Sequence, residues 1–318
     1  MTAATVAVLV ELRDGAVTRP TYEAMTLARS LGTPVAVVLA DDFDPAEGAR
    51  LGTYGAAEVR IVAGDVRLPS RAAAALKQAV GDAAVVLMVS TFVNKEIAAR
   101  LAVATGAGVV VDAAGAEMID GRVETTQTVF AATWNVRTRI ESERAIVAIR
   151  PNTTMAEPAE VPGVAAESVV TVDLPAARES VVSVEPVPAP EGVPLAEAPV
   201  VVSGGRGTNG DYTLVRRMAE VLGGAVGASR DATDEGWISH EHMVGQTGTT
   251  VTPALYLACG ISGAVHHRGG MQASGTIVAV NIDPDAPIFE ISDFGVVGDL
   301  GDVLPQAIAR IEERRRAR

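Results

Sequence analysis

Short apolar runs alternate with stretches of helical spacing along the first third of the chain. The apolar runs are rich in valine and continuous, which is typical of strands buried on both faces of a parallel sheet. The predicted strands are residues 6–12, 35–40, 59–63, 85–90 and 109–112. Between them, alanine and leucine recur at helical spacing over residues 22–31, 70–80 and 94–105.

The three predicted helices end near Gly32, Gly81 and Gly106. Glycine is the residue that most readily adopts the left-handed conformation which closes a helix. Regular alternation of strand and helix predicts a doubly wound α/β fold with a mostly parallel sheet.

From Gly121 onward, predicted strands follow one another with no helix between them. They are residues 123–130, 145–150, 168–174 and 181–187, and we interpret them as an extension or edge of the same sheet. Residues 185–199 then contain five prolines, which neither a helix nor a central strand tolerates. We therefore predict an N-terminal α/β scaffold and partner-binding domain at residues 1–190, a proline-rich linker at 191–198 and a cofactor domain at 199–318.

Composition narrows the class of protein. The chain has 318 residues, 48% of them hydrophobic, but no apolar run approaches the roughly 20 residues of a membrane-spanning helix. Its first residues lack the pattern of a secretory signal, so we expect a cytoplasmic protein that does not insert into membranes. The net charge of −13 argues against nucleic-acid binding, and Cys259, the single cysteine, excludes an internal disulfide.

Candidate chemistry is concentrated after residue 198. A predicted strand at residues 200–204 leads into a glycine-rich turn that carries Arg206. Glycines at the carboxyl end of a parallel strand allow a ligand close to the backbone, and the arginine supplies positive charge that suits a diphosphate. Taken alone, the same residues could form an ordinary turn with a surface arginine. The first half contains no comparable phosphate-binding signature.

Further glycine turns follow at residues 245–248 and 260–263, and a helix is predicted to open at residue 264. Another buried strand, residues 276–281, ends in Asn281. Polar groups at several strand ends predict a dinucleotide crevice. His240 and His242 are interpreted as surface residues, because no matching set of ligands accompanies them, and no metal site is predicted.

Six motifs in order make residues 200–300 resemble the C-terminal FAD-binding domain of electron transfer flavoprotein alpha subunits. They are Ser-Gly-Gly-Arg-Gly, Gly-Ala-Ser-Arg, Val-Gly-Gln-Thr-Gly, Gly-Ile-Ser-Gly-Ala-x-x-His, Ala-x-Asn-x-Asp-Pro-x-Ala-Pro-Ile-Phe and Gly-Asp-Leu. Each motif alone is a weak signal, whereas six in this order are specific. The resemblance implies a Rossmann-like FAD-binding fold for the C-terminal domain.

The resemblance also implies which residues contact FAD. Arg230 matches an arginine against the flavin ring, Thr247 a threonine that reaches flavin N5, and His267 a histidine near flavin O2. Ser262 to His267 match the turn that holds the pyrophosphate and ribityl chain, and the last three residues of the following list match contacts toward the adenosine. The full set is Arg206, Ser229, Arg230, Val244, Gly245, Gln246, Thr247, Ser262, Gly263, Ala264, Val265, His266, His267, Asn281, Asp299 and Leu300.

Two positions depart from the family's pattern. His266 stands where the family usually has glutamine, and Thr249 where many members have lysine. Neither change removes an implied flavin contact, but both alter the charge near the cofactor. We therefore expect a flavin potential that differs from that of relatives.

The function implied by the resemblance is that of a redox carrier without substrate turnover of its own. A beta subunit would complete a heterodimer that holds one FAD, with AMP in the beta subunit. Electrons would pass from flavoprotein dehydrogenases, such as the acyl-CoA dehydrogenases of fatty acid β-oxidation, to a membrane-bound quinone oxidoreductase. Alternatives are a subunit of an NADH-dependent bifurcating flavoprotein, a nucleotide-dependent enzyme on a related fold, and a cofactor-free nucleotide sensor.

Overall fold

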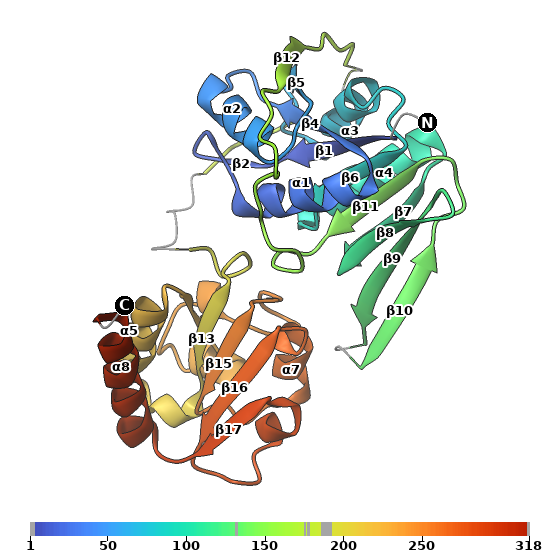
Figure 1. Ribbon diagram of the computed structural model, residues 1–318. Helices are drawn as coiled ribbons and strands as arrows, with labels where there is room; N and C mark the ends of the chain where they lie inside the picture. The colour runs from blue at the N-terminus through green and yellow to red at the C-terminus, as the bar shows by residue number, and fades with distance from the viewer. Residues whose placement is uncertain (1–3, 131–132, 175, 177–178, 186–192, 317–318) are drawn as a thin grey trace. The chain divides into compact units, whose positions relative to one another are not determined.

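The computed structural model describes residues 4–130, 133–174, 176, 179–185 and 193–316 (Figure 1). The chain divides into two compact units. The first consists of Met1–Gln127 with Asn135–Val187, and the second of Thr128–Trp134 with Pro188–Arg318. Within the described residues, no helix combines the length and the apolar character needed to cross a membrane.

A seven-stranded parallel sheet forms the centre of the first unit, in the order β12-β5-β4-β1-β6-β11-β7. Its strands are β1 (Thr5–Val10), β4 (Thr33–Leu39), β5 (Glu58–Val62), β6 (Val85–Val89), β7 (Gly108–Ala113), β11 (Ala145–Ile149) and β12 (Ala166–Val169). A three-stranded sheet, β8 (Gly115–Ile119), β9 (Arg122–Val129) and β10 (Trp134–Arg139), and a two-stranded ribbon, β2 (Leu12–Arg13) and β3 (Ala16–Val17), accompany it.

Helices cover both faces of this sheet. They are α1 (Arg19–Leu31), α2 (Pro45–Thr53), α3 (Pro69–Ala79) and α4 (Phe92–Thr105). Alternate residues of β1 point to opposite faces: Val8 packs in the cluster with α1, and Leu9 in the cluster with α3 and α4. Burial on both faces explains why these strands are uniformly apolar.

The second unit is a five-stranded parallel sheet in the order β14-β13-β15-β16-β17. Its strands are β13 (Val200–Gly204), β14 (Ala225–Ala228), β15 (Leu255–Cys259), β16 (Thr276–Asn281) and β17 (Phe294–Val297). Its helices are α5 (Thr213–Leu222), α6 (Arg230–Asp234), α7 (Val265–Met271) and α8 (Leu300–Arg316), with short 3₁₀ turns η1 (Arg206–Thr208), η2 (His240–His242) and η3 (Pro287–Ile291).

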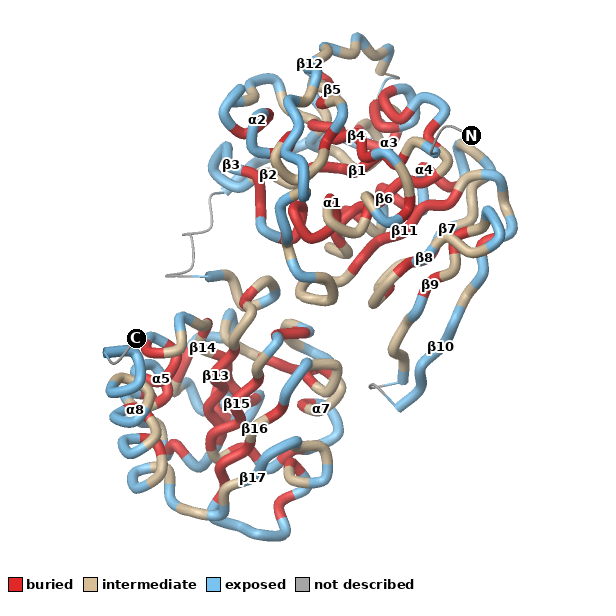
Figure 2. The backbone as a smooth tube through the Cα atoms, viewed as in Figure 1, coloured by how far each residue is buried: buried red, intermediate tan, exposed pale blue. Residues whose placement is uncertain are grey.

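Helices α5 and α8 pack together on one face of this sheet, and α7 contributes Met271 to the core on the other face (Figure 1). Buried residues run along the central strands of both sheets (Figure 2). The predicted fold class, two doubly wound α/β parts with parallel sheets, is confirmed.

Several predicted strands after residue 121 are placed differently. The strand predicted at 145–150 is no edge: β11 lies between β6 and β7, as its five buried residues require. The strand predicted at 123–130 leaves the main sheet and pairs with β8 as β9. Only 166–169 of the next region forms an edge strand, and residues 170–174 do not continue it.

The last predicted strand, 181–187, is wrong for residues 181–185, which are irregular and exposed; residues 186 and 187 lie outside the described residues. Part of the predicted linker, residues 191 and 192, also lies outside them. Leu195 and Ala198 pack against the core of the second unit. The domain limits predicted from the sequence, 1–190, 191–198 and 199–318, stay a prediction.

Helix ends agree in part with the glycine signals. Gly106 closes α4 in the left-handed conformation at φ 70°, whereas Gly32 after α1 has φ 164° and is extended. Gly81 has φ 58° but lies beyond the end of α3. Helix α2 was not predicted, because its sequence contains two glycines and few apolar residues; the Asp44–Pro45 start, in which the Asp44 carboxylate accepts from Ala46 N–H, is the signal that marks it.

A buried carboxylate ties α2 to the rest of the first unit. Glu47 is 7% exposed, and its Oε2 accepts hydrogen bonds from the Val17 backbone N–H at 3.0 Å and the Tyr22 hydroxyl at 3.1 Å. Arg50 donates to Oε1 at 3.0 Å. Burial, reinforced by the Glu47 carboxylate, raises the pKa of Tyr22 well above its usual value, so the phenol stays protonated and donates.

Replacing Glu47 with leucine therefore leaves two buried donors without an acceptor. We expect Glu47→Leu to lower the free energy of unfolding by about 3 kcal/mol, measured by chemical denaturation. Glu47→Gln keeps an acceptor oxygen, and we expect it to lose clearly less. Equal stability of both variants and the wild type would contradict this role.

Candidate cofactor site

The predicted site residues gather at one edge of the second sheet. Because all five strands are parallel, their carboxyl ends meet at the same edge (Figure 1). Arg206 follows β13, Ser229 and Arg230 follow β14, Ser262 to His267 follow β15, Asn281 ends β16, and Asp299 and Leu300 follow β17. Residues 244–247 join this edge through an isolated bridge between Ala228 and Met243.

Glycines bring the loops after β13 and β15 into direct backbone contact. Gly205 N–H donates to the Cys259 carbonyl at 2.9 Å, and Gly207 N–H to the Gly260 carbonyl at 3.0 Å. A Cβ on Gly205 would lie 2.4 Å from the Gly260 oxygen. A Cβ on Gly207 would lie 2.7 Å from the Gly260 Cα. After β13 the chain adds β14 on one side of it and then β15 on the other side. The contact between the loops after β13 and β15 therefore lies at the switch point where doubly wound sheets bind ligands.

Two predicted arginines are paired with carboxylates of α6. Arg206 Nε lies 3.1 Å from Asp231 Oδ2, and Arg230 Nε lies 3.1 Å from Asp234 Oδ2. All four side chains are at least half exposed. Ser229 begins the helix: its Oγ accepts from Ala232 N–H at 3.4 Å, and its own N–H donates to the Gly204 carbonyl at 2.9 Å.

Asp231 and Asp234 are not among the residues predicted from the sequence. The spacing of four residues from Arg230 to Asp234 on one helix was a signal that could have identified the second of them. The Arg206–Asp231 pair joins two separate loops, and only the fold reveals it.

The loop that holds Val244, Gly245, Gln246 and Thr247 rests on α7. A Cβ on Gly270 would lie 2.4 Å from the Gly245 Cα, so the two backbones touch. Gln246 N–H donates to the His266 carbonyl at 2.9 Å, and the His266 ring Nδ1 lies 3.1 Å from Gln246 Oε1. Val244 and Gly245 are buried, whereas the side chains of Gln246 and Thr247 are exposed at the edge.

The turn before α7 is equally tight. Gly263 has φ +85°, and a Cβ there would lie 2.4 Å from the Ile288 backbone nitrogen. Ser262, Ala264, Val265 and His266 are exposed around it. Asn281 stabilises the turn from β16, because its Nδ2 donates to the Ile261 carbonyl at 2.9 Å.

His267 is the buried member of this group, with 7% of its surface exposed. Its Nε2 lies 2.8 Å from the hydroxyl of Tyr256, which is fully buried. Burial lowers the pKa of His267 to about 4, and the Val244 backbone and Asp231 oppose only part of that shift. The imidazole is therefore neutral near pH 7. Its Nδ1 is buried and makes no hydrogen bond within the described part of the chain.

Asp299 and Leu300 share no hydrogen bond or ion pair with the other predicted residues within the described part of the chain. Asp299 instead begins α8, since its Oδ1 accepts from Gly301 N–H at 2.7 Å, and Leu300 packs against the core shared by α5 and α8. They lie at the same carboxyl edge of the sheet as the other residues because they follow β17.

The described residues contain no group of three or more His, Cys, Asp or Glu side chains that could hold a metal ion. His242 Nδ1 instead lies 2.9 Å from the Val226 carbonyl. Thr249, one of the two departures from the family's pattern, pairs through its backbone with Met243 at 2.7 Å.

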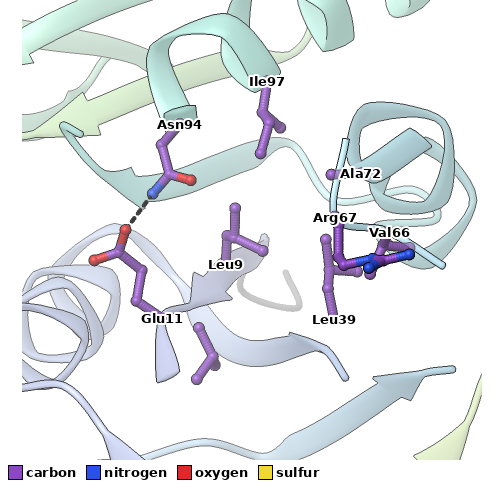
Figure 3. Close-up of a pocket in the computed structure, with 9 residues that line it drawn as sticks. Leu9, Glu11, Leu39, Val66, Arg67, Ala72, Asn94 and Ile97 are labelled. Carbon is purple, nitrogen blue, oxygen red and sulfur yellow. Dashed lines mark hydrogen bonds between the residues drawn. The ribbon is translucent and has the colours of Figure 1, made fainter. Parts of the chain in front are cut away.

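A separate hollow of about 200 Å³ lies in the first unit, at the carboxyl ends of β1 and β4 (Figure 3). Leu9, Leu39 and Ile97 line its apolar part. On one side, Asn94 Nδ2 donates to Glu11 Oε1 at 2.8 Å. None of the predicted site residues line this hollow.

A doubly wound parallel sheet with glycine loops at its switch point gives the second unit the architecture of a dinucleotide-binding domain. Two family profiles match the chain: "Electron transfer flavoprotein FAD-binding domain" over residues 194–272, and "Electron transfer flavoprotein domain" over residues 6–177. The chain belongs to the family of electron transfer flavoprotein alpha subunits.

Named relatives agree over nearly the full length. The electron transfer flavoprotein subunit alpha of Mycobacterium leprae is 40% identical over 97% of this chain and 98% of its own length. That of Syntrophomonas wolfei is 36% identical over 96% and 98%, and that of Bacillus subtilis 34% over 94% and 95%. The predicted family is therefore confirmed.

The residues present fit FAD. Gly205 and Gly263 bring no side chain to the carboxyl edge, so a diphosphate there would lie next to the main chain. Arg206 and Arg230 supply exposed positive charge at the same edge, and the buried Nδ1 of His267 is a polar atom for which the described chain offers no partner.

The contact between the glycine loops makes Gly205 sensitive to a single methyl group. We expect Gly205→Ala to force the loops after β13 and β15 apart, to destabilise the protein by about 1–3 kcal/mol in thermal unfolding, and to reduce its retention of FAD. Gly163→Ala is the control, because a Cβ at Gly163 meets its nearest neighbour only at 3.8 Å. If both variants lost the same stability and retained FAD equally well, the contact between the glycine loops would not be what Gly205→Ala disturbs.

The neutral state of His267 gives a pH dependence with a definite sign. Between its folded pKa of about 4 and an ordinary value of about 6.5, the unfolded chain binds a proton that the folded chain does not. The contribution of neutral His267 to the free energy of unfolding is fully present above this pH window and is lost as the pH falls through it. We expect the wild type to lose about 2 kcal/mol more than His267→Gln between pH 7.5 and 5, measured by denaturant titration. Parallel losses in the two proteins would contradict the depressed pKa.

Proposed function

We propose that this chain is the FAD-binding alpha subunit of a heterodimeric electron carrier. The observation that carries the proposal is the glycine-lined switch point of the second sheet, with Arg206 and Arg230 beside it. The family profile over residues 194–272 supports FAD as the ligand. When bound, FAD supplies the redox chemistry, because it accepts and releases electrons singly or in pairs.

The residues of the chain bind and orient the cofactor in this proposal. Gly205, Gly207 and Gly263 let the loops at the carboxyl edge pack backbone against backbone. The diphosphate is assigned to this edge, where Arg206 offsets its charge. Arg230, Thr247 and His267 are assigned to the flavin end, where His267 is neutral near pH 7. The adenosine end is assigned to Asn281, Asp299 and Leu300.

A role as carrier and not as an enzyme rests on the chemistry of the ionisable groups. Among the described residues of the second unit, the buried ionisable side chains are held in their neutral forms. Burial raises the pKa of Cys259 to about 12 and that of Tyr212 to about 12, and lowers that of His267. An enzyme active site would instead need a nucleophile, a general acid and a general base within reach of one another.

The proposed partners are a beta subunit that completes the flavin pocket and holds AMP, flavoprotein dehydrogenases such as acyl-CoA dehydrogenases, and a membrane-bound quinone oxidoreductase. Relatives that carry the name "subunit alpha" support a beta subunit as partner. A cytoplasmic location is part of the same proposal.

The test is to produce this chain with and without its beta partner and to count FAD from the visible spectrum. We expect one FAD per heterodimer, reduced by an acyl-CoA dehydrogenase in the presence of its substrate. Two FAD per heterodimer with reduction by NADH would replace the simple carrier with a bifurcating flavoprotein. Absence of flavin from both preparations would contradict the proposal.

A further inference from the structure

Both arginines of the proposed flavin site are already engaged by carboxylates, and both carboxylates come from one short helix. Asp231 and Asp234 lie on α6, three residues apart, and each contacts a different arginine at 3.1 Å. Arg230 reaches Asp234 one helical turn along α6, while Arg206 reaches Asp231 from the loop after β13. Helix α6 thus presents one negative charge to each cation.

Pairing changes the charge that a ligand meets at this edge. Arg206 and Arg230 alone would present two positive charges, which the two aspartates balance. Asp299 adds a further carboxylate to the predicted set, whereas His267 is neutral near pH 7. An anionic cofactor would therefore bind beside arginines that are largely neutralised, in a chain whose net charge is −13.

Exposure determines how strong these pairs are. The side chains are 69% and 57% exposed in the Arg206–Asp231 pair, and 64% and 51% in the Arg230–Asp234 pair. Pairs this exposed contribute about 0.2–1 kcal/mol, because water and salt screen them. Covering the edge with a ligand removes that water, so the same charges then interact with the ligand and with each other more strongly.

We propose that Asp231 and Asp234 are positioning residues of the flavin site: they hold Arg206 and Arg230 in place and lower the reduction potential of the bound flavin. The proposal rests on the proposed function. Its physical basis is that reduction adds negative charge to the cofactor, and a nearby carboxylate opposes that charge while it also offsets the attraction of the arginine.

The experiment compares Asp231→Asn, Asp234→Asn and the double variant in the FAD-loaded heterodimer. We expect each substitution to shift the midpoint potential to more positive values, with the largest shift in the double variant. The dissociation constant for FAD should fall by about two- to fivefold per substitution, which is the scale of an exposed charge interaction. Both quantities are measured without turnover, by redox titration and by flavin release.

Matched variants separate charge from structure. Glu220→Gln removes the same charge from an exposed pair, Arg217–Glu220 on α5, whose residues are not among those proposed to bind FAD, and should leave the potential unchanged. Asp234→Glu keeps the charge and should restore the wild-type potential. A loss of thermal stability with an unmoved potential would assign Asp234 a merely structural role on α6.

The two proposals fail in different ways. If the wild-type heterodimer carries one FAD and the aspartate variants retain it with unchanged potentials, the role of α6 is overturned while the carrier function stands. If the wild-type heterodimer carries none, the function itself is wrong.

Discussion

Backbone contact between the loops that follow β13 and β15 is the constraint on which the edge of the second sheet depends. Two hydrogen bonds, from Gly205 to Cys259 and from Gly207 to Gly260, hold these loops closer than any side chain would allow. Ser229 is joined to the same point through the Gly204 carbonyl, which places the start of α6 beside it. The arginine pairs, the turn before α7 and the neighbouring strand ends are arranged around this contact.

Polar chemistry in the second unit is divided by depth. Buried groups such as Tyr256, Cys259 and His267 are kept neutral, because a charge without a partner is costly in the interior. The charged groups, Arg206 and Arg230 with their aspartates, stand at the exposed edge where water compensates them. The interior therefore fixes the geometry of the edge, and the surface sets its charge.

Sequence pattern alone predicted the valine-rich strands and the helices between them, because burial on both faces leaves little freedom in composition. It could not predict the position of β11, since periodicity identifies a strand without giving its neighbours. Helix α2 escaped because glycine weakens its pattern. For the site, ordered motifs located the strand ends, whereas the partnership of Arg206 with Asp231 depends on which loops the fold brings together.

The order of strands in the first sheet also bears on how the chain is assembled during synthesis. Strand β11 is inserted between β6 and β7, although both precede it in the chain, and β12 completes the opposite edge beside β5. A growing polypeptide cannot finish this sheet until residue 169 has been made, and such distant pairings are slow to form. In the second sheet the last two strands, β16 and β17, are each added beside the strand that precedes them in the chain, so that unit can grow outward as it leaves the ribosome.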